Sequence, residues 1–435
     1  MSVEEIEAFR VGRWQSCVVK APPGSGKTQL LVDAAPKWSE YGSSVLITAL
    51  TNEQVDDICE RLGKSNKQLS IVRFTSSTHT IGRDLPKNVR VVRSPKNLPN
   101  SYDILVSTSA KLAIGGCFRK FDVMFVDEAW QIALRDLLPL TRFADRLVMI
   151  GDPGQIPPVQ SVSHLRWDTA PFRPGEAMPE PFLRNLRLRR NTKTIELKTC
   201  RRLPHDSVAL VNLFYDFPFA AEAKPKERFL ATVASKKNDP LDRALVSLRE
   251  ASSAIITIPS DEGMGIDTDV HLANVIAAAA DRVMKQTQAV RTSEADGKRG
   301  RAIKASDIGI SATHRAMNAA IRSALPKRLI AEGLTVDTPE RWQGQQRAVM
   351  LVAHPLSGIE HPSGFDLETG RLCVMSSRHQ AALLVFARDH VKLTLETHMP
   401  SAIQSPGLPD AIGNGHAIHS RFWEFHQNGR IFGYL

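Results

Sequence analysis

The sequence predicts an α/β protein of two domains, each built around a parallel β-sheet. Strand-length apolar runs recur along the chain and end in Gly, Asp, Ser or Thr. Segments with apolar residues at helical spacing lie between several of these runs. The pattern lapses over residues 160–193, which are rich in Pro and Arg, and then restarts. Buried strands that alternate with helices are typical of a parallel sheet covered on both faces.

The first domain is expected over residues 1–194. Helix-like segments at 26–38 and 52–62 separate some of its strands, and the strand-like runs are residues 16–21, 43–50, 103–109, 121–128 and 146–152. The second domain is expected over residues 195–399, with strand-like runs at 253–259, 307–315, 347–355 and 381–387.

Residues 400–435 are expected to form a C-terminal tail. His416 and His419 of this segment would share a helical face near His426, so a metal site is one interpretation. Neither Cys nor acidic residues accompany these histidines, which favours surface or packing roles.

Composition sets broad limits on function. The 435 residues are 42% hydrophobic and 23% charged, which excludes a mainly disordered chain. The net charge of +10 suits a polyanionic partner. A charge of this size taken alone gives roughly even odds that the partner is nucleic acid. The five cysteines form no C-x-x-C pair, and no apolar stretch is long enough to cross a bilayer. We therefore expect a cytoplasmic protein without a membrane partner.

The stretch "APPGSGKT", residues 21–28, follows an apolar strand and precedes a helix, which is the context of a P-loop. Backbone N–H groups of such a loop surround phosphates, the lysine reaches the β and γ phosphates, and the hydroxyl ligates magnesium. A chance glycine-rich turn would not place strand, loop, lysine, hydroxyl and helix in this order. The candidate nucleotide-binding residues are Pro23, Gly24, Ser25, Gly26, Lys27 and Thr28.

The stretch "VMFVDEAWQI", residues 123–132, puts two acids directly after a buried-type strand. Unpaired carboxylates are costly to bury, so a cation and a phosphate chain are expected to face them. We expect this strand to lie beside the P-loop strand, with Asp127 holding magnesium and Glu128 polarising the attacking water. An exposed acidic turn, the alternative, does not explain the apolar residues around the pair.

A third stretch, "IGDPGQIPPV" at 150–159, follows the next apolar strand. In this order the stretches resemble the superfamily 1, subclass B helicases, in the branch of senataxin and the nonsense-mediated-decay helicase. Their motifs are G-P-P-G-T-G-K-T, D-E-A-x-Q and G-D-x-x-Q-L-P-P. The resemblance implies two RecA-like P-loop domains in tandem, with the nucleotide in the interdomain cleft. It also implies that Gln155 senses the γ-phosphate.

Weaker matches continue into the second half. "LKTCRRLPH" gives Arg202, "SATHRAMN" gives Arg315, "VDTPERWQGQQ" gives Thr338 and Gly344, and "SSRHQ" gives Arg378. The resemblance implies that Arg202 and Arg378 are arginine fingers and that Gly344 contacts the nucleotide. A surface arginine and a helix-end charge are the respective alternatives for the two arginines. Glu340 and Gln346 stand where the family usually has Asp and Glu.

The segment "LTNEQVDD" resembles a family segment that contacts nucleic acid, which implies backbone phosphate binding by Thr51 and Asn52. Thr108 would act similarly in the first domain, and Arg315 and Thr338 in the second. Helix N-capping is the alternative for Thr51 and Thr108.

Together these matches imply a helicase or translocase that depends on ATP and Mg²⁺ and moves 5′-to-3′ on single-stranded DNA or RNA. The alternative is an ATP-gated nucleic-acid clamp or complex subunit that does not unwind alone. No room for the family's larger accessory inserts is evident, so a protein partner could supply such modules. A P-loop enzyme acting on a small substrate would leave the second-half motifs unexplained.

Overall fold

The computed structural model describes residues 2–114, 119–159, 167, 170–235, 237–261, 264–398 and 410–434. The chain divides into two compact units. The first consists of Met1–Pro153 and Pro157–Lys198, and the second consists of Gly154–Ile156 and Thr199–Leu435. Each unit is described by itself below.

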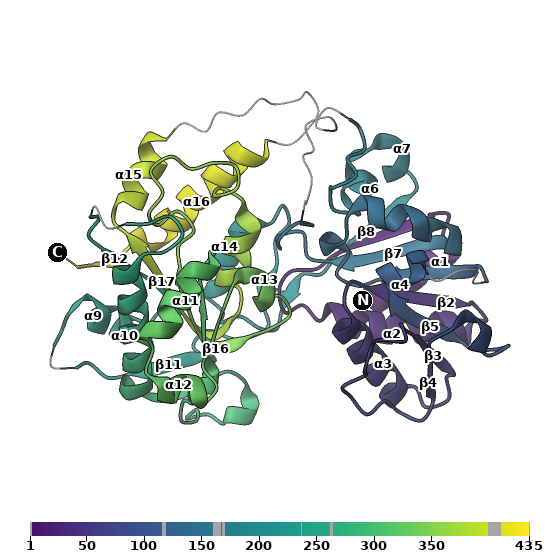
Figure 1. Ribbon diagram of the computed structural model, residues 1–435, viewed down its shortest axis with the longest axis horizontal. Helices are drawn as coiled ribbons and strands as arrows, with labels where there is room; N and C mark the ends of the chain where they lie inside the picture. Colours follow the sequence, from purple (N-terminus) through teal and green to yellow (C-terminus); the bar gives the residue numbers. More distant parts are fainter. Residues whose placement is uncertain are drawn as a thin grey trace. The chain divides into compact units, whose positions relative to one another are not determined.

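The first unit is built on an eight-stranded sheet of order β4-β3-β5-β2-β6-β7-β1-β8, in which all neighbouring strands pair in parallel (Figure 1). Its central strands are buried on both faces, as the apolar runs predict. The strands are β1 (Ser16–Lys20), β2 (Val45–Ala49), β3 (Ile71–Phe74), β4 (Val89–Val92), β5 (Ile104–Thr108), β6 (Phe121–Val126), β7 (Ala144–Gly151) and β8 (Thr192–Glu196).

Helices cover both faces of this sheet. One apolar cluster joins the sheet to α1 (Ser2–Val11), α2 (Lys27–Glu40) and α3 (Asn52–Ser65). A second cluster joins the opposite face to shorter helices and includes Leu112 and Leu137. The shorter helices of this unit are α4 (Ser109–Ile114), α5 (Leu134–Leu137), α6 (Glu180–Arg184) and α7 (Leu186–Arg189).

The second unit has a six-stranded parallel sheet of order β15-β14-β16-β17-β12-β18. Its strands are β12 (Ser253–Ile258), β14 (Ile308–Ser311), β15 (Thr335–Asp337), β16 (Arg347–Ala353), β17 (His379–Arg388) and β18 (Ile431–Gly433). Two parallel sheets covered by helices confirm the predicted α/β fold class.

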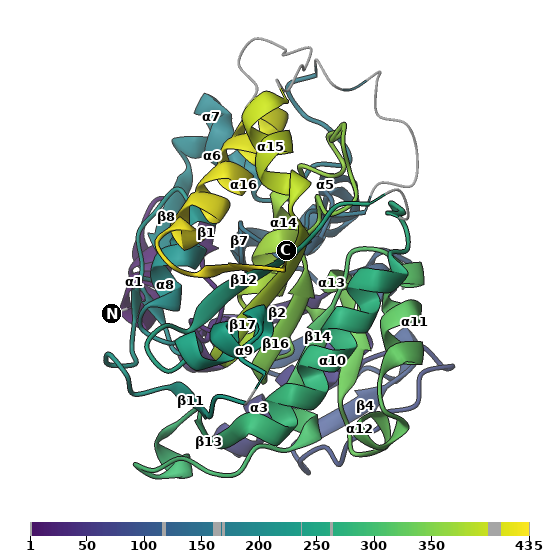
Figure 2. The same cartoon turned by 90° about the vertical axis from the view of Figure 1, so that its left-hand side faces the viewer.

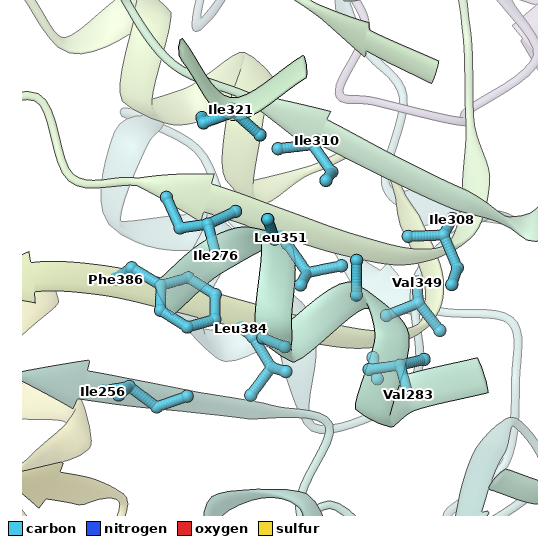
Figure 3. Packing of buried hydrophobic residues seen from close by; sticks show 14 of the residues in the cluster. Ile256, Ile276, Val283, Ile308, Ile310, Ile321, Val349, Leu351, Leu384 and Phe386 are labelled. Atoms are coloured by element: carbon cyan, nitrogen blue, oxygen red, sulfur yellow. The ribbon is translucent and has the colours of Figure 1, made fainter. Parts of the chain in front are cut away.

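Helices cover both faces of the second sheet (Figure 2), and each face carries its own apolar cluster. On one face, Ile310, Leu351 and Phe386 of the sheet meet helix α10 (Figure 3). The helices of this cluster are α9 (Pro240–Ser247), α10 (Val270–Gln286), α11 (Arg315–Ala324) and α12 (Lys327–Ala331). The cluster on the other face includes α13 (Pro339–Trp342), α14 (Thr369–Ser376), α15 (His390–Thr397) and α16 (Ala411–Gln427).

Smaller elements complete the second unit. The short parallel pair is β9 (Thr199–Cys200) with β10 (Ala220–Ala221), and the antiparallel pair is β11 (Phe229–Thr232) with β13 (Thr287–Arg291). Helix α8 (Ser207–Val211) follows β9. No helix in the described ranges is both long enough and apolar enough to span a membrane.

The segment that the sequence set apart as a tail is partly built into the second unit. Strand β18 pairs with β12, and Phe422 and Trp423 of α16 are buried in the core. His426 hydrogen-bonds Ser253 Oγ at 3.1 Å, and burial lowers its pKa to about 4. His419 is also buried, which lowers its pKa to about 3. These two histidines are therefore packing residues, because burial keeps them neutral among apolar side chains.

Helix α16 should make a measurable contribution to the stability of the second unit. The Phe422→Ala substitution removes a fully buried ring and should lower the free energy of unfolding by about 3–5 kcal/mol. Urea unfolding measures the change. Glu424→Ala, at an exposed position of the same helix, is the control and should change it by less than about 0.5 kcal/mol. Equal effects of the two substitutions would show that α16 is not part of the core.

Candidate functional site

The P-loop connects β1 to α2 in the first unit. Gly24 and Gly26 have φ angles of 68° and 88°, in the left-handed region where glycine is strongly favoured. Helix α2 begins at Lys27, so the loop presents backbone N–H groups at a helix N-terminus. The Ser25 hydroxyl is buried and has no hydrogen-bond partner among the described residues. This loop is shaped to receive phosphate oxygens.

The carboxylate of Asp127 lies at the start of this helix. Thr28 Oγ1 donates a hydrogen bond to Asp127 Oδ2 at 3.1 Å, and the backbone N–H of Glu128 donates to Oδ1 at 3.0 Å. Asp127 is only 2% exposed. Burial and the nearby Glu128 carboxylate raise the pKa of Asp127 to about 7, although Lys27 opposes the shift. A buried carboxyl group with a raised pKa is suited to binding a cation, because the cation would stabilise the ionised form of the carboxyl group.

Lys27 lies between two further carboxylates. Its Nζ atom is 3.8 Å from Glu128 Oε1 and 3.7 Å from Asp152 Oδ2. Glu128 has a φ of 51°, a strained conformation for a residue other than glycine, and its Oε2 atom is buried without a partner among the described residues. Such strain is typical of functional positions. Lys27 is therefore held near the carboxylates of Glu128 and Asp152, and the oxygens of a bound phosphate can attract its ammonium group away from them.

Asp152 was missed by the sequence analysis. It is 1% exposed and directly follows β7, the strand that pairs with β1. Adjacent parallel strands place their carboxyl ends together, so the Gly-Asp pair after this apolar run was the available signal.

The expected position of the Asp127 strand was wrong. Strand β6 does not pair with the P-loop strand β1, because β7 lies between them. The side chain of Thr28, in the first turn of α2, nevertheless reaches Asp127 across the carboxyl edge of the sheet.

Thr28 and Asp127 are the candidate metal ligands. No three His, Cys, Asp or Glu side chains within the described ranges form a metal site. A divalent cation would therefore be held by the Thr28 hydroxyl, the Asp127 carboxylate and oxygens of the ligand itself, which is typical of Mg²⁺.

Gln155 has its packing contacts in the second unit, together with Gly154 and Ile156. A Cβ atom on Gly154 would lie 2.6 Å from the Tyr215 ring, and one on Gly370 would lie 2.7 Å from the Ile156 backbone. Gln155 itself is 5% exposed. The segment is thus packed closely between these neighbours, and the expected role of Gln155 at the γ-phosphate stays a prediction.

The second unit brings the two candidate finger arginines into one cluster. Arg202 donates from Nη1 to the backbone carbonyl of Ser377 at 3.2 Å, and Ser377 directly precedes Arg378. Arg378 is 1% exposed, and its Nε and Nη2 atoms have no hydrogen-bond partner among the described residues. A buried guanidinium with unused donors is suited to an anionic ligand. Gly344, the candidate nucleotide contact, has a φ of 78°.

The two threonines of the first unit that are proposed for nucleic-acid binding cap helices through their side chains. Thr51 Oγ1 accepts from Gln54 N at 3.3 Å in a capping box, and Thr108 Oγ1 accepts from Lys111 N at 3.3 Å. Both hydroxyl groups thus act as helix N-caps in this structure, as the alternative interpretation expected. Asn52 Oδ1 accepts from the buried Arg73 at 2.8 Å.

In the second unit, the other two candidates lie at helix starts. Arg315 is exposed in the first turn of α11, and Thr338 is the N-cap residue of α13 without a side-chain capping bond.

Comparison with known proteins connects this geometry to a protein class. Residues 4–168 match a sequence family described as an AAA domain. The chain is 22% identical over 335 residues to the DNA replication ATP-dependent helicase/nuclease JHS1 of Arabidopsis thaliana, covering 76% of this chain and 24% of that protein. It is 24% identical over 381 residues to the helicase/nuclease DNA2 of Saccharomyces cerevisiae, covering 83% of this chain and 24% of that protein. The chain thus spans about a quarter of the length of these relatives.

A solved structure, an arterivirus nonstructural protein 10 helicase in complex with DNA, aligns with a TM-score of 0.42 at 16% identity, covering 88% of this chain and 62% of that one. The sequence relatives support the resemblance to superfamily 1 helicases. The finer placement beside senataxin and the nonsense-mediated-decay helicase stays a prediction.

The raised pKa of Asp127 has a consequence for stability. The folded protein holds this proton up to about pH 7, whereas the unfolded chain releases it near its ordinary value of 3.8. The proton on Asp127 therefore stabilises the folded state at low pH, and this stabilisation is lost as the pH rises from about 3.8 to about 7. Without nucleotide or metal, raising the pH from about 5 to about 7.5 should destabilise the wild type by about 1–3 kcal/mol more than Asp127→Asn.

Urea unfolding at a series of pH values measures this difference. Parallel pH profiles for the two proteins would contradict the raised pKa. Asp122→Asn is the control, because it makes the same substitution at the exposed second residue of β6.

Proposed function

We propose that this chain is an ATP hydrolase of the helicase type, which couples Mg²⁺-ATP hydrolysis to movement on single-stranded DNA or RNA. The observation that carries the proposal is the cluster at the P-loop in which the buried Asp127 and Asp152 lie with Lys27, Thr28 and Glu128. The sequence similarity to ATP-dependent helicase/nucleases supports the choice among P-loop proteins.

The P-loop and four residues of the cluster have parts in the proposed reaction. The glycines and backbone N–H groups of the loop bind the phosphate chain, and Lys27 shifts from the carboxylates to the β and γ phosphates. Thr28 and Asp127 would hold Mg²⁺, which supplies charge neutralisation on the phosphates when bound. Glu128 accepts a proton from the attacking water, and its buried, unpartnered oxygen is available for that hydrogen bond.

The resemblance implies that Arg202, Arg378, Gln155 and Gly344 of the second unit act on the same nucleotide. Arginines stabilise the charge that develops on the transferred phosphoryl group. The unused donors of the buried Arg378 support this assignment. Since the γ-phosphate would bind both arginines, its loss on hydrolysis would release the second unit.

Nucleic acid would be held mainly through its backbone by Thr51, Asn52, Thr108, Arg315 and Thr338. The Asn52 amide oxygen is engaged by Arg73, which leaves the N–H side of the amide to donate to a phosphate oxygen. The net charge of +10 favours such a polyanion.

The proposal is tested by measuring ATP hydrolysis without nucleic acid, with single-stranded DNA and with single-stranded RNA. We expect at least one polymer to stimulate hydrolysis about ten-fold or more, with the stimulation weakening as salt rises. ATP binding without stimulation by either polymer would contradict the proposal. Strand displacement on a partial duplex then separates a helicase from an ATP-gated clamp.

Glu128→Gln should retain ATP binding but hydrolyse ATP about 10²–10⁴-fold more slowly, because the amide cannot accept the proton of water. Binding of a fluorescent ATP analogue and steady-state hydrolysis measure the two effects separately. Glu40→Gln, at the exposed far end of α2, is the matched control and should behave as the wild type. Hydrolysis by Glu128→Gln at the wild-type rate would remove Glu128 from the base role.

A further inference from the structure

Strand β3 of the first unit carries a charged residue among apolar ones. Arg73 is fully buried, as are Val72 and Phe74 on either side of it. Arginine is seldom buried to this extent unless its donors are paired. Ile71, two residues earlier and so on the same face of the strand, packs in the apolar cluster that includes helix α3. Arg73 therefore extends toward α3.

The guanidinium of Arg73 has an acceptor at each of its three nitrogens. Its Nε atom donates to Asp56 Oδ1 at 2.7 Å, and its Nη1 atom donates to the carbonyl of Phe74 at 2.7 Å. Its Nη2 atom donates to Asn52 Oδ1 at 2.8 Å. Because the group is planar and held at three corners, both its direction and its plane are fixed.

The two acceptors on α3 are held together. Asn52 and Asp56 are four residues apart, so both side chains leave the same face of the helix. Asp56 is also buried, and its second oxygen lies 2.8 Å from His79 Nε2. The carboxylate thus offsets the charge of Arg73 and is fixed from two sides. All of these contacts lie within the first unit.

The contact with Arg73 determines which way the Asn52 amide faces. An arginine side chain has donors only, so the atom of Asn52 that it meets must be the carbonyl oxygen. The amide nitrogen, with its two N–H donors, must then point away from Arg73. Asn52 is the first residue of α3 and is partly exposed, so these donors are presented at the end of the helix that follows β2.

Anchoring of α3 to the sheet does not explain the contact with Asn52. The buried pair of Arg73 and Asp56 alone would serve that purpose. Asn52 is not needed to cap the helix either, because Thr51 and Gln54 already form a capping box. The bond from Arg73 to Asn52 therefore has its clearest consequence in the orientation of the amide.

We infer that Arg73 is a positioning residue, which holds the Asn52 amide with its N–H donors directed at phosphate oxygens of the nucleic acid. The inference rests on the proposed function, in which Asn52 binds the nucleic-acid backbone. Arg73 is buried and paired with Asp56, so it contributes orientation and makes no phosphate contact of its own.

The first test changes Asn52 itself. Fluorescence anisotropy of labelled poly-thymidine and poly-uridine strands gives Kd for each protein. Asn52→Ala should raise Kd about three- to ten-fold. Asn52→Asp keeps an acceptor for Arg73 but has no N–H donors, so it should raise Kd at least as much. A role in stability alone predicts the opposite for Asn52→Asp, because the bond to Arg73 is retained.

Gln54→Glu is the matched control for the added charge. It makes the same change from amide to carboxylate in the same turn of α3, and a carboxylate can still accept from the backbone N–H of Thr51. Gln54→Glu should raise Kd less than Asn52→Asp does. Equal effects of the two substitutions would overturn the inference, and this comparison leaves the core unchanged.

The second test removes the positioning group. The double substitution Arg73→Met with Asp56→Leu deletes the ion pair without leaving a buried charge. It should raise Kd about three- to ten-fold, and it should cause no further loss in the Asn52→Ala background. The slope of log Kd against log salt concentration should stay unchanged, whereas loss of a direct arginine–phosphate contact would reduce it by about one. Arg90→Met, at an exposed position of β4, is the control for losing an arginine.

The outcomes separate this inference from the proposed function. A wild-type Kd for the double substitution, or an equal loss in both backgrounds, would overturn the positioning role. A wild-type Kd for Asn52→Ala would also overturn it, although binding by the wild type would leave the proposed function standing. Failure of the wild type to bind either strand would overturn both.

Discussion

The carboxylate of Asp127 is buried beside that of Glu128, and the P-loop site is organised around this costly arrangement. Burial, together with repulsion from the nearby Glu128 carboxylate, raises the pKa of Asp127 to about 7. Lys27 partly compensates them, and it also lies 3.7 Å from Asp152. The apolar strands β6 and β7 hold the acids in place, since the last four residues of β6 and the last five of β7, which lead up to the acids, are buried. A cation together with a phosphate chain would satisfy all of these groups.

Local sequence patterns predicted the parts of the site that depend on neighbouring residues. The α/β class followed from alternating apolar runs, and the P-loop residues and the two acids followed from short motifs after strands. Strand order was not accessible in this way, because it is set by packing across the sheet. For this reason the predicted position of β6 was wrong. Asp152 was missed although the Gly-Asp pair after its apolar run was a local signal.

The same limit applies to the second unit. The contact between Arg202 and Gln346 and the pairing of β18 with β12 join residues that are far apart in the sequence. Nothing in either local segment signals its partner. The C-terminal helix illustrates the point, because its histidines are explained by burial in a core that forms only when distant strands assemble.

The central claim is that Asp127 is an acid kept ready for a cation, and proton release tests it most directly. Titration of Mg²⁺-ATP near pH 6.5, in two buffers with different ionisation enthalpies, gives the number of protons released on binding. The account predicts that the wild type releases a substantial fraction of a proton more than Asp127→Asn, because the bound cation forces Asp127 to ionise. Equal proton release by the two proteins would contradict the account.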